Sequence, residues 1–115
     1  MRYHVITLPD NTELKFRLTA DEIETIERVQ KTKILDYIQD YSVTKMITLL
    51  EKMWKQDDCK TTHDDAVELF DTLADNGYAV ETIAKEIIWP TCVVSGLLTE
   101  SDLRKALKKP EQATQ

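Results

Sequence analysis

The stretch ELKFRLTADE, residues 13–22, decides the fold because the sequence pattern changes within it from that of a β-strand to that of an α-helix. Leu14, Phe16 and Leu18 alternate with charged residues, as in a β-strand that has one apolar face and one face in water. Thr19 follows directly and Glu22 stands three residues later, which is the pattern of a capping box at the start of an α-helix. We therefore expect a strand to end and a helix to begin within this stretch.

A second stretch of strand-forming residues precedes this strand and predicts a β-hairpin over residues 3–18. Residues 3–8 are rich in β-branched and aromatic side chains, and Pro9-Asp10-Asn11-Thr12 supplies the chemistry of a turn. Because a two-stranded hairpin is only marginally stable by itself, we expect helices to cover its apolar face.

The rest of the chain carries apolar residues at helical spacing. The clearest helix follows Ser42 and should end near Asp57, with an apolar face that includes Leu50 and Trp54. Helices are expected from about residue 20, over 34–38, 43–57, 62–76 and 79–89, and over 103–107. The predicted fold class is therefore α+β, mainly α, with an N-terminal β-hairpin followed by a compact bundle of about five helices.

Pro90 interrupts the apolar pattern of residues 79–98. Proline lacks a backbone N–H, and its ring clashes with the carbonyl group four residues before it in a regular helix. We expect the helix over 79–89 either to kink or to stop at this point. Residues 91–98 are apolar enough to continue as a helical segment that ends at Gly96.

Length and composition indicate one ordered domain. The chain has 115 residues, of which 42% are hydrophobic and 31% are charged, and a chain of this size buries roughly two thirds of its unfolded surface in one core. The domain is expected over residues 1–109, with the hairpin at 3–18 and the helical bundle at 20–108. Residues 110–115 are expected to form a frayed tail.

Charge and hydropathy disfavour several classes of function. The 21 acidic and 15 basic residues give a net charge of −6, which repels phosphate groups and disfavours direct nucleic-acid binding. No stretch has the pattern of a signal peptide or the length of a membrane span, so we expect a cytoplasmic protein without a membrane partner. In that compartment Cys59 and Cys92 are expected to be reduced thiols.

No motif for catalysis, a metal ion or a cofactor stands out. Cys59 and His63 have a spacing that two metal ligands could have, but the paired short-spacing patterns of zinc sites are missing. Asp64 and Asp65 belong in the first turn of a helix, where the helix dipole favours acidic side chains. We therefore expect a protein that is not an enzyme and has no metal or cofactor.

Residues 65–88 have the spacing of a helix-turn-helix around Asn76-Gly77. The second helix carries Glu81 and Glu86 but only Lys85 as a cation, whereas a helix that reads DNA presents Arg, Lys, Asn or Gln. Two packed core helices are the simpler interpretation, and a small prophage regulator is an alternative.

Two groups of apolar residues are candidate contacts for a partner protein. Met46, Met53 and Trp54 lie on the helix predicted over 43–57, and a place in the core is the alternative for each. The second group lies around the Pro90 interruption and needs cover from the core, from a second copy of the chain or from a partner. This group comprises Trp89, Val93, Val94, Leu97 and Leu98.

Several short motifs follow one another in a recognisable order. They are Phe16-Arg17-Leu18-Thr19, Ile-x-x-Ile-Glu over 23–27, Leu49-Leu50, Asp-Asp-Ala-x-x-Leu-x-Asp-x-x-x-x-x-Gly over 64–77, and Ser-Gly-Leu-Leu over 95–98. Together with the short N-terminal hairpin that ends in the first of them, they span about residues 3–98. Their order resembles the tail assembly chaperones of long-tailed phages and prophages of Gram-positive bacteria.

The resemblance implies a function in the assembly of a phage tail. Such a chaperone binds the long tape-measure protein, keeps it soluble and helps to recruit tail-tube subunits, without catalysis. The resemblance also implies that the protein acts in the bacterial cytoplasm and is absent from the mature virion. A head–tail adaptor that remains in the particle is an alternative of the same binding class.

Overall fold

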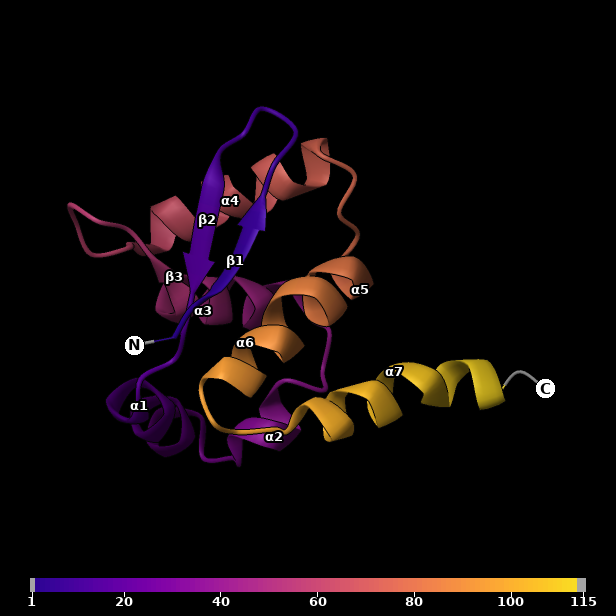
Figure 1. The fold of residues 1–115 in the computed structure, drawn as a ribbon. Coiled ribbons are helices and arrows are strands. Elements are labelled where there is room, and N and C mark those ends of the chain that lie inside the picture. Colours follow the sequence, from indigo (N-terminus) through magenta and orange to yellow (C-terminus); the bar gives the residue numbers. More distant parts are fainter. Residues whose placement is uncertain (1, 114–115) are drawn as a thin grey trace.

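The computed structural model describes the backbone of residues 2–113 and the side chains of residues 2–107, and it confirms the α+β, mainly α fold class (Figure 1). Three antiparallel strands lie in the order β1-β2-β3, and helices cover the sheet. The elements are β1 (His4–Thr7), β2 (Glu13–Phe16), α1 (Ala20–Gln30), α2 (Ile34–Tyr37), α3 (Val43–Met53), β3 (Trp54–Lys55), α4 (His63–Asp75), α5 (Val80–Ile83), the π-helical turn η1 (Ala84–Ile88), α6 (Trp89–Val94) and α7 (Glu100–Ala113).

The predicted hairpin is formed by β1 and β2. Ile6 pairs with Leu14, and the carboxylate of Asp10 accepts a hydrogen bond of 3.0 Å from the backbone N–H of Thr12 in the turn. Asn11 adopts a positive φ of 71°, a conformation that asparagine tolerates better than most residues. The turn chemistry of residues 9–12 therefore sets the register that buries Leu14.

The third strand corrects the helix predicted over residues 43–57. Helix α3 ends at Met53, and Trp54–Lys55 form β3, in which Trp54 pairs with Phe16 of β2. Trp54 has helical spacing from Leu50, but the open edge of β2 offers its backbone a strand partner. The Lys55 ammonium also donates to the carbonyl of Lys52 at 2.7 Å, which satisfies one free acceptor at the end of α3.

The capping box predicted at Thr19 is confirmed, and α4 is capped at both of its ends. Thr19 and Glu22 form a capping box at α1, and Thr62 and Asp65 form one at α4. Gly77, with a φ of 88°, follows α4 in the left-handed conformation expected at the end of a helix.

The chain passes Pro90 through a π-helical turn instead of stopping. The N–H of Trp89 donates to the carbonyl of Ala84, five residues back, and α6 continues to Val94. Because Pro90 has no N–H for the carbonyl of Glu86, that carbonyl needs another donor. His4 of β1 supplies it through a hydrogen bond of 2.7 Å from Nε2.

The core joins the hairpin to the helices. The largest fully buried side chains are Phe16, Leu18, Met46, Leu49, Leu50, Met53, Leu73, Ile83, Ile87, Ile88, Thr91 and Cys92. Beyond β2, Arg17 Nη1 donates to the carbonyl of Val94 at 2.8 Å, and the N–H of Leu18 donates to Ser95 Oγ at 2.9 Å. The start of the chain is therefore bonded directly to the end of α6.

Helix α7 is longer than the terminal helix predicted over 103–107. Its backbone includes residues 110–113, which the sequence assigns to a frayed tail; residues 114–115 of that tail lie outside the described residues. Thr99 and Asp102 form a capping box that starts this helix. In Figure 1 α7 extends away from the rest of the molecule.

Candidate functional site

The predicted partner contacts fall into two classes of burial. Met46 and Met53 are completely buried in the core, which is the alternative that the sequence allows for both. Trp54, Trp89, Val93, Val94, Leu97 and Leu98 are half-buried.

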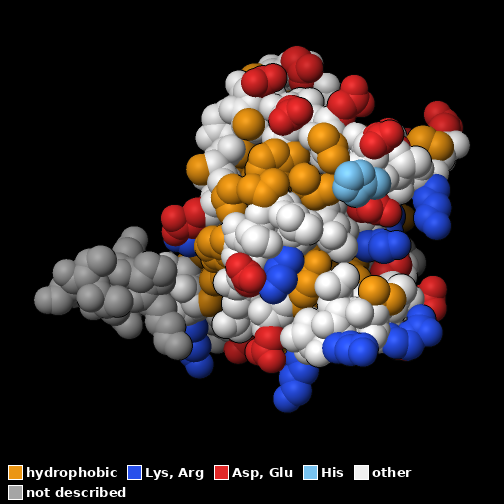
Figure 2. All heavy atoms as spheres, turned by 180° about the vertical axis from the view of Figure 1, so that it is seen from behind, with side chains coloured by type: hydrophobic (Ala, Val, Ile, Leu, Met, Phe, Trp, Pro, Cys, Tyr) orange, Lys and Arg blue, Asp and Glu red, His pale blue; other side chains and the backbone are white. Residues whose placement is uncertain are grey.

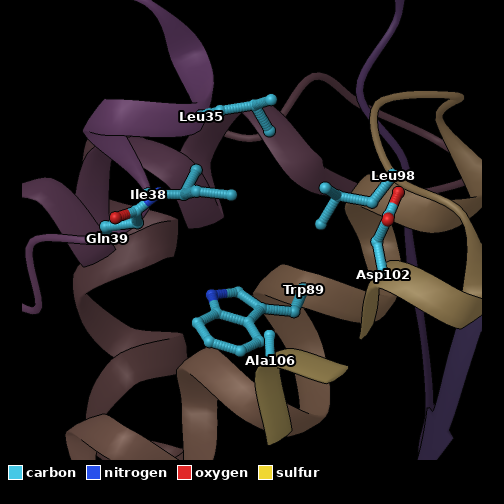
Figure 3. A pocket seen from close by; sticks show the side chains of 7 residues that line it. All are labelled: Leu35, Ile38, Gln39, Trp89, Leu98, Asp102 and Ala106. Carbon is cyan, nitrogen blue, oxygen red and sulfur yellow. The ribbon is translucent and has the colours of Figure 1, made fainter. Parts of the chain in front are cut away.

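Trp89 and Leu98 meet in a pocket of about 360 Å³ between α2, α6 and α7 (Figure 3). We call it the Trp89 pocket. Its lining residues are Leu35, Ile38, Gln39, Trp89, Leu98, Asp102 and Ala106. The lining is mainly apolar, and the indole ring of Trp89 forms much of the wall that Figure 3 shows.

The short helix α2 and the two residues that follow it bring Leu35, Ile38 and Gln39 to the pocket. Ile34 and Tyr37 are buried, while Leu35 remains 37% exposed. The carboxylate of Glu27, near the end of α1, accepts a hydrogen bond of 2.9 Å from the N–H of Ile34 and so caps α2. This bond fixes the single turn of α2 on the core, which leaves Leu35 and Gln39 at the pocket.

The opposite wall depends on the start of α7. The N–H of Thr99 donates to the Asp102 carboxylate at 3.1 Å, and the N–H of Asp102 donates to Thr99 Oγ1 at 3.0 Å. The pKa of the Asp102 carboxyl lies below its usual range, mainly because of the hydrogen bond from the backbone N–H of Thr99 and secondly because of hydrogen bonding with the Thr99 side chain. Asp102 is therefore an anion that holds the helix end, and Ala106 lines the pocket one turn later.

Trp89 provides an unpaired donor in this apolar lining. Its Nε1 atom is buried and has no acceptor among the described residues. In Figure 3 the nitrogen lies on the side of the ring toward Ile38 and Gln39. A buried N–H without a partner costs about 1–3 kcal/mol. An occupant that offers an acceptor beside an apolar group would recover this energy once a small rotation of the indole brought the N–H to the pocket.

The other predicted contacts lie in separate hollows. Val93 and Val94 line a smaller hollow of about 280 Å³ beside α7, and Trp54 lines another of about 360 Å³ beside α4. Leu97 packs against the core. The sequence interpretation misses Leu35 and the rest of the α2 wall, although an apolar residue beside the buried stripe of so short a helix is a usable signal.

Among the described residues, the cysteines and the acidic side chains do not come together in one site. Burial raises the pKa of Cys92 to about 12, whereas Cys59 is exposed in the loop before α4. Within residues 2–107 no group of three or more His, Cys, Asp or Glu side chains is placed to hold a metal ion. His63 lies 3.8 Å from Asp64 at the exposed start of α4.

The helix-turn-helix spacing corresponds to α4 and α5. Helix α5 is a single turn that leads directly into η1, and the second half of the pair is largely core. Its fully buried side chains are Ile83, Ala84, Ile87 and Ile88. The apolar positions that give this spacing are therefore used to pack the two segments into the molecule.

No helix of the described part of the chain is long and apolar enough to cross a membrane. No protein-family model, curated protein or solved structure matches the sequence or the fold. The Trp89 pocket and the sequence motifs are therefore the basis for assigning a function.

Proposed function

We propose that this chain is a non-catalytic protein-binding domain that holds an apolar side chain of its partner in the Trp89 pocket. The observation that carries the proposal is the half-buried indole of Trp89, which lines an apolar pocket open to solvent and whose N–H finds no acceptor among the described residues. Protein-binding hot spots are enriched in tryptophan and lie in pockets that exclude water. One apolar anchor with an adjacent hydrogen-bond acceptor matches this lining.

The size of the pocket supports a side chain as its occupant. Ligand pockets have volumes of roughly 300–1,000 Å³, and a volume of about 360 Å³ is at the lower end of that range. The wall formed by Leu35 and Leu98 suits the apolar face of a helix whose projecting residue enters beside Trp89. Helix-in-groove binding of this kind uses anchors at helical spacing.

The proposed function is that of a phage or prophage tail assembly chaperone. The tape-measure protein is the proposed partner, and recruitment of tail-tube subunits is the proposed outcome in the bacterial cytoplasm before the virion is complete. Support comes from the order of motifs over residues 16–19, 64–77 and 95–98 and from an acidic, mainly helical body. An acidic surface repels the phosphate groups of nucleic acids, so a protein is the favoured partner for the apolar surfaces of this chain.

The test is capture of the partner by variants of the tagged protein in the native host after prophage induction. Leu35→Asp places a charge at the pocket, and Val29→Asp makes a comparable change on α1 at a side chain that is 64% exposed and outside the pocket lining. We expect the wild type and Val29→Asp to recover the tape-measure protein. Leu35→Asp should recover at least about tenfold less, which is about 1.4 kcal/mol of binding.

Further measurements test the Trp89 pocket as the binding site separately from the function as a tail assembly chaperone. Trp89→Phe keeps an aromatic ring but removes the donor, so we expect weaker capture with a retained fold. Equal capture by Leu35→Asp and Val29→Asp would contradict the pocket as the binding site. Recovery of the chain in purified phage particles would contradict the chaperone function and favour a head–tail adaptor.

A further inference from the structure

Helix α4 has an unusual distribution of charge. Its 13 residues include no Lys or Arg. Its acidic residues are Asp64, Asp65, Glu68, Asp71 and Asp75. Only Asp65 is used in the capping box at the start of the helix, so the other four carboxylates give one helix a strongly negative surface.

Apolar side chains lie directly beside these acids. Val67, Phe70 and Ala74 are spaced by three and four residues, so they share one side of α4. Val67 and Phe70 are half-buried and Ala74 is exposed, although the core-facing stripe of α4 is made by Ala66, Leu69 and Leu73. The apolar surface of α4 therefore extends past the core to the solvent.

Helix α3 adds a second apolar row. Val43 is 47% exposed and Ile47, one turn later, is half-buried. Helices α3 and α4 pack against each other. We call the set Val43, Ile47, Val67, Phe70 and Ala74 the α3–α4 strip. Figure 2 shows apolar side chains gathered on the back of the molecule, with Asp and Glu side chains around their upper edge.

The cations of α3 are directed away from the strip. The ammonium of Lys45 lies 2.8 Å from the Asp40 carboxylate and 5.0 Å from the centre of the Tyr37 ring. Lys52 lines a different hollow, together with Asp21 and Glu22 of α1. The acidic residues that α4 places on this side of the molecule extend from Asp64 at one end of the helix to Asp75 at the other, and α4 has no Lys or Arg to offset them.

We propose that the α3–α4 strip binds a basic amphipathic helix of a partner protein. The apolar face of such a helix would cover the strip, and its Lys or Arg side chains would meet Asp64, Asp71 and Asp75. A second copy of this chain is a poor occupant, because it would bring two acidic α4 helices together in molecules of net charge −6. The charge pattern therefore selects a cationic partner.

The α3–α4 strip is separate from the Trp89 pocket, since no residue belongs to both. The two surfaces draw on different helices, α3 and α4 in one case and α2, α6 and α7 in the other. The inference therefore does not depend on the proposed function, and either can fail alone.

Two designed peptides test the inference. Each has about 20 residues, long enough to form a helix, and repeats Leu and Ala at helical spacing; one carries Lys on its polar face and the other Glu. We expect the Lys peptide to bind the full chain and to shift the amide NMR signals of α3 and α4. The Glu peptide should not bind.

Charge-reversal variants provide the matched control. Asp71→Lys/Asp75→Lys reverses two exposed acids beside the strip, and Asp57→Lys/Asp58→Lys makes the same change of net charge in the loop before α4. We expect the first variant to bind the Lys peptide at least about fivefold more weakly than the second, because rim charges have modest effects individually. The amide spectra of both variants show whether the fold is retained.

Three results would overturn the inference. Equal binding of the Lys and Glu peptides would show that charge does not select the occupant. Equal losses in the two charge-reversal variants would show only an effect of net charge. Shifts confined to the residues around Trp89 would place the peptide in the other pocket and leave the α3–α4 strip without an occupant.

Discussion

At the scale of single residues, His4 and Pro90 form one structural unit although they lie far apart in the sequence. Pro90 leaves the carbonyl of Glu86 without its helical donor, and the imidazole of His4 lies 2.7 Å from that oxygen. The Nε2 atom must carry the proton, because a carbonyl only accepts. The N-terminal strand thus completes the hydrogen bonding of a helix near the other end of the chain.

This hydrogen bond predicts that the loss of stability caused by His4→Ala depends on whether residue 90 is proline. His4→Ala should lower the free energy of unfolding by about 1 kcal/mol, the usual net value of one hydrogen bond. In a Pro90→Ala background the cost should be clearly smaller, because the N–H of the new alanine can donate to Glu86. Urea unfolding of the four proteins of this double-mutant cycle measures the difference. An equal cost in both backgrounds would show that His4 does not replace the missing donor.

The two cysteines predict a contrast in reactivity. Burial raises the pKa of the Cys92 thiol to about 12, so almost no thiolate exists at neutral pH, whereas the Cys59 side chain is exposed. Iodoacetamide should therefore modify Cys59 in the native protein and both cysteines in denaturant, as counted by mass spectrometry. The Cys59→Ser variant is the control and should remain unmodified until it unfolds. Rapid modification of that native variant would contradict the burial of Cys92.

At the scale of elements, the sequence predicts features that depend on neighbouring residues, such as helix caps. It does not predict the pairing of segments that are far apart in the sequence. The caps at Thr19, Thr62 and Gly77 are predictable because each is satisfied within a few residues. The strand Trp54–Lys55 is not, because its partner Phe16 is distant in sequence and Trp54 also fits the helical spacing of α3. The π-helical turn before Pro90 likewise depends on a donor from β1.

The residues of the Trp89 pocket also divide into those that the sequence identifies and those whose position depends on contacts between distant segments. Trp89 and Leu98 are identified from the sequence as apolar residues that need cover, and the structure places both in one pocket. Leu35 and Ile38 are not identified, because their position depends on the bond between Glu27 and the start of α2. To predict a pocket between three helices, one must know how the helices are placed relative to one another. The spacing of apolar residues along a single helix does not give this placement.

The capping box of α4 predicts a pH-dependent contribution to stability. Bonds from the backbone and hydroxyl of Thr62 lower the pKa of Asp65 in the folded state. A carboxyl whose pKa is lower in the folded state stabilises the protein above its unfolded pKa, about 3.9, and that contribution is lost as the pH falls further. Asp65→Asn should therefore lower Tm at pH 6, and the gap to the wild type should narrow below about pH 4.

Thermal unfolding followed by circular dichroism at both pH values measures this gap. Replacement of Asp65 by Asn keeps the size of the side chain, so the change in the gap reports the charge and its hydrogen bonds. A gap of the same size at pH 6 and pH 3 would show that the ionised carboxylate is not what stabilises the start of α4.

At the scale of the whole molecule, the two halves of the chain are bonded to each other through residues 17 and 18. Arg17 donates to the carbonyls of Arg2 and Val94, and the N–H of Leu18 donates to Ser95 Oγ. A guanidinium at the end of α6 is also favoured by the helix dipole. The segment that follows the hairpin therefore does more than cover the helices, since Arg17 supplies a donor to the carbonyl of Val94 at the end of α6 and Leu18 holds the side chain of Ser95.

These connections predict that the sheet and the C-terminal helices unfold together. Trp54 lies in β3 and Trp89 in α6, and they are the two tryptophans of the chain. Trp89→Phe therefore reports on the sheet by fluorescence, and Trp54→Phe reports on the helical side. In each variant we expect the urea transition followed by fluorescence to coincide with the transition followed by far-UV circular dichroism, as two-state unfolding requires. An earlier fluorescence transition in one variant would show that its side of the molecule unfolds separately, and would contradict the prediction that residues 1–109 form a single domain.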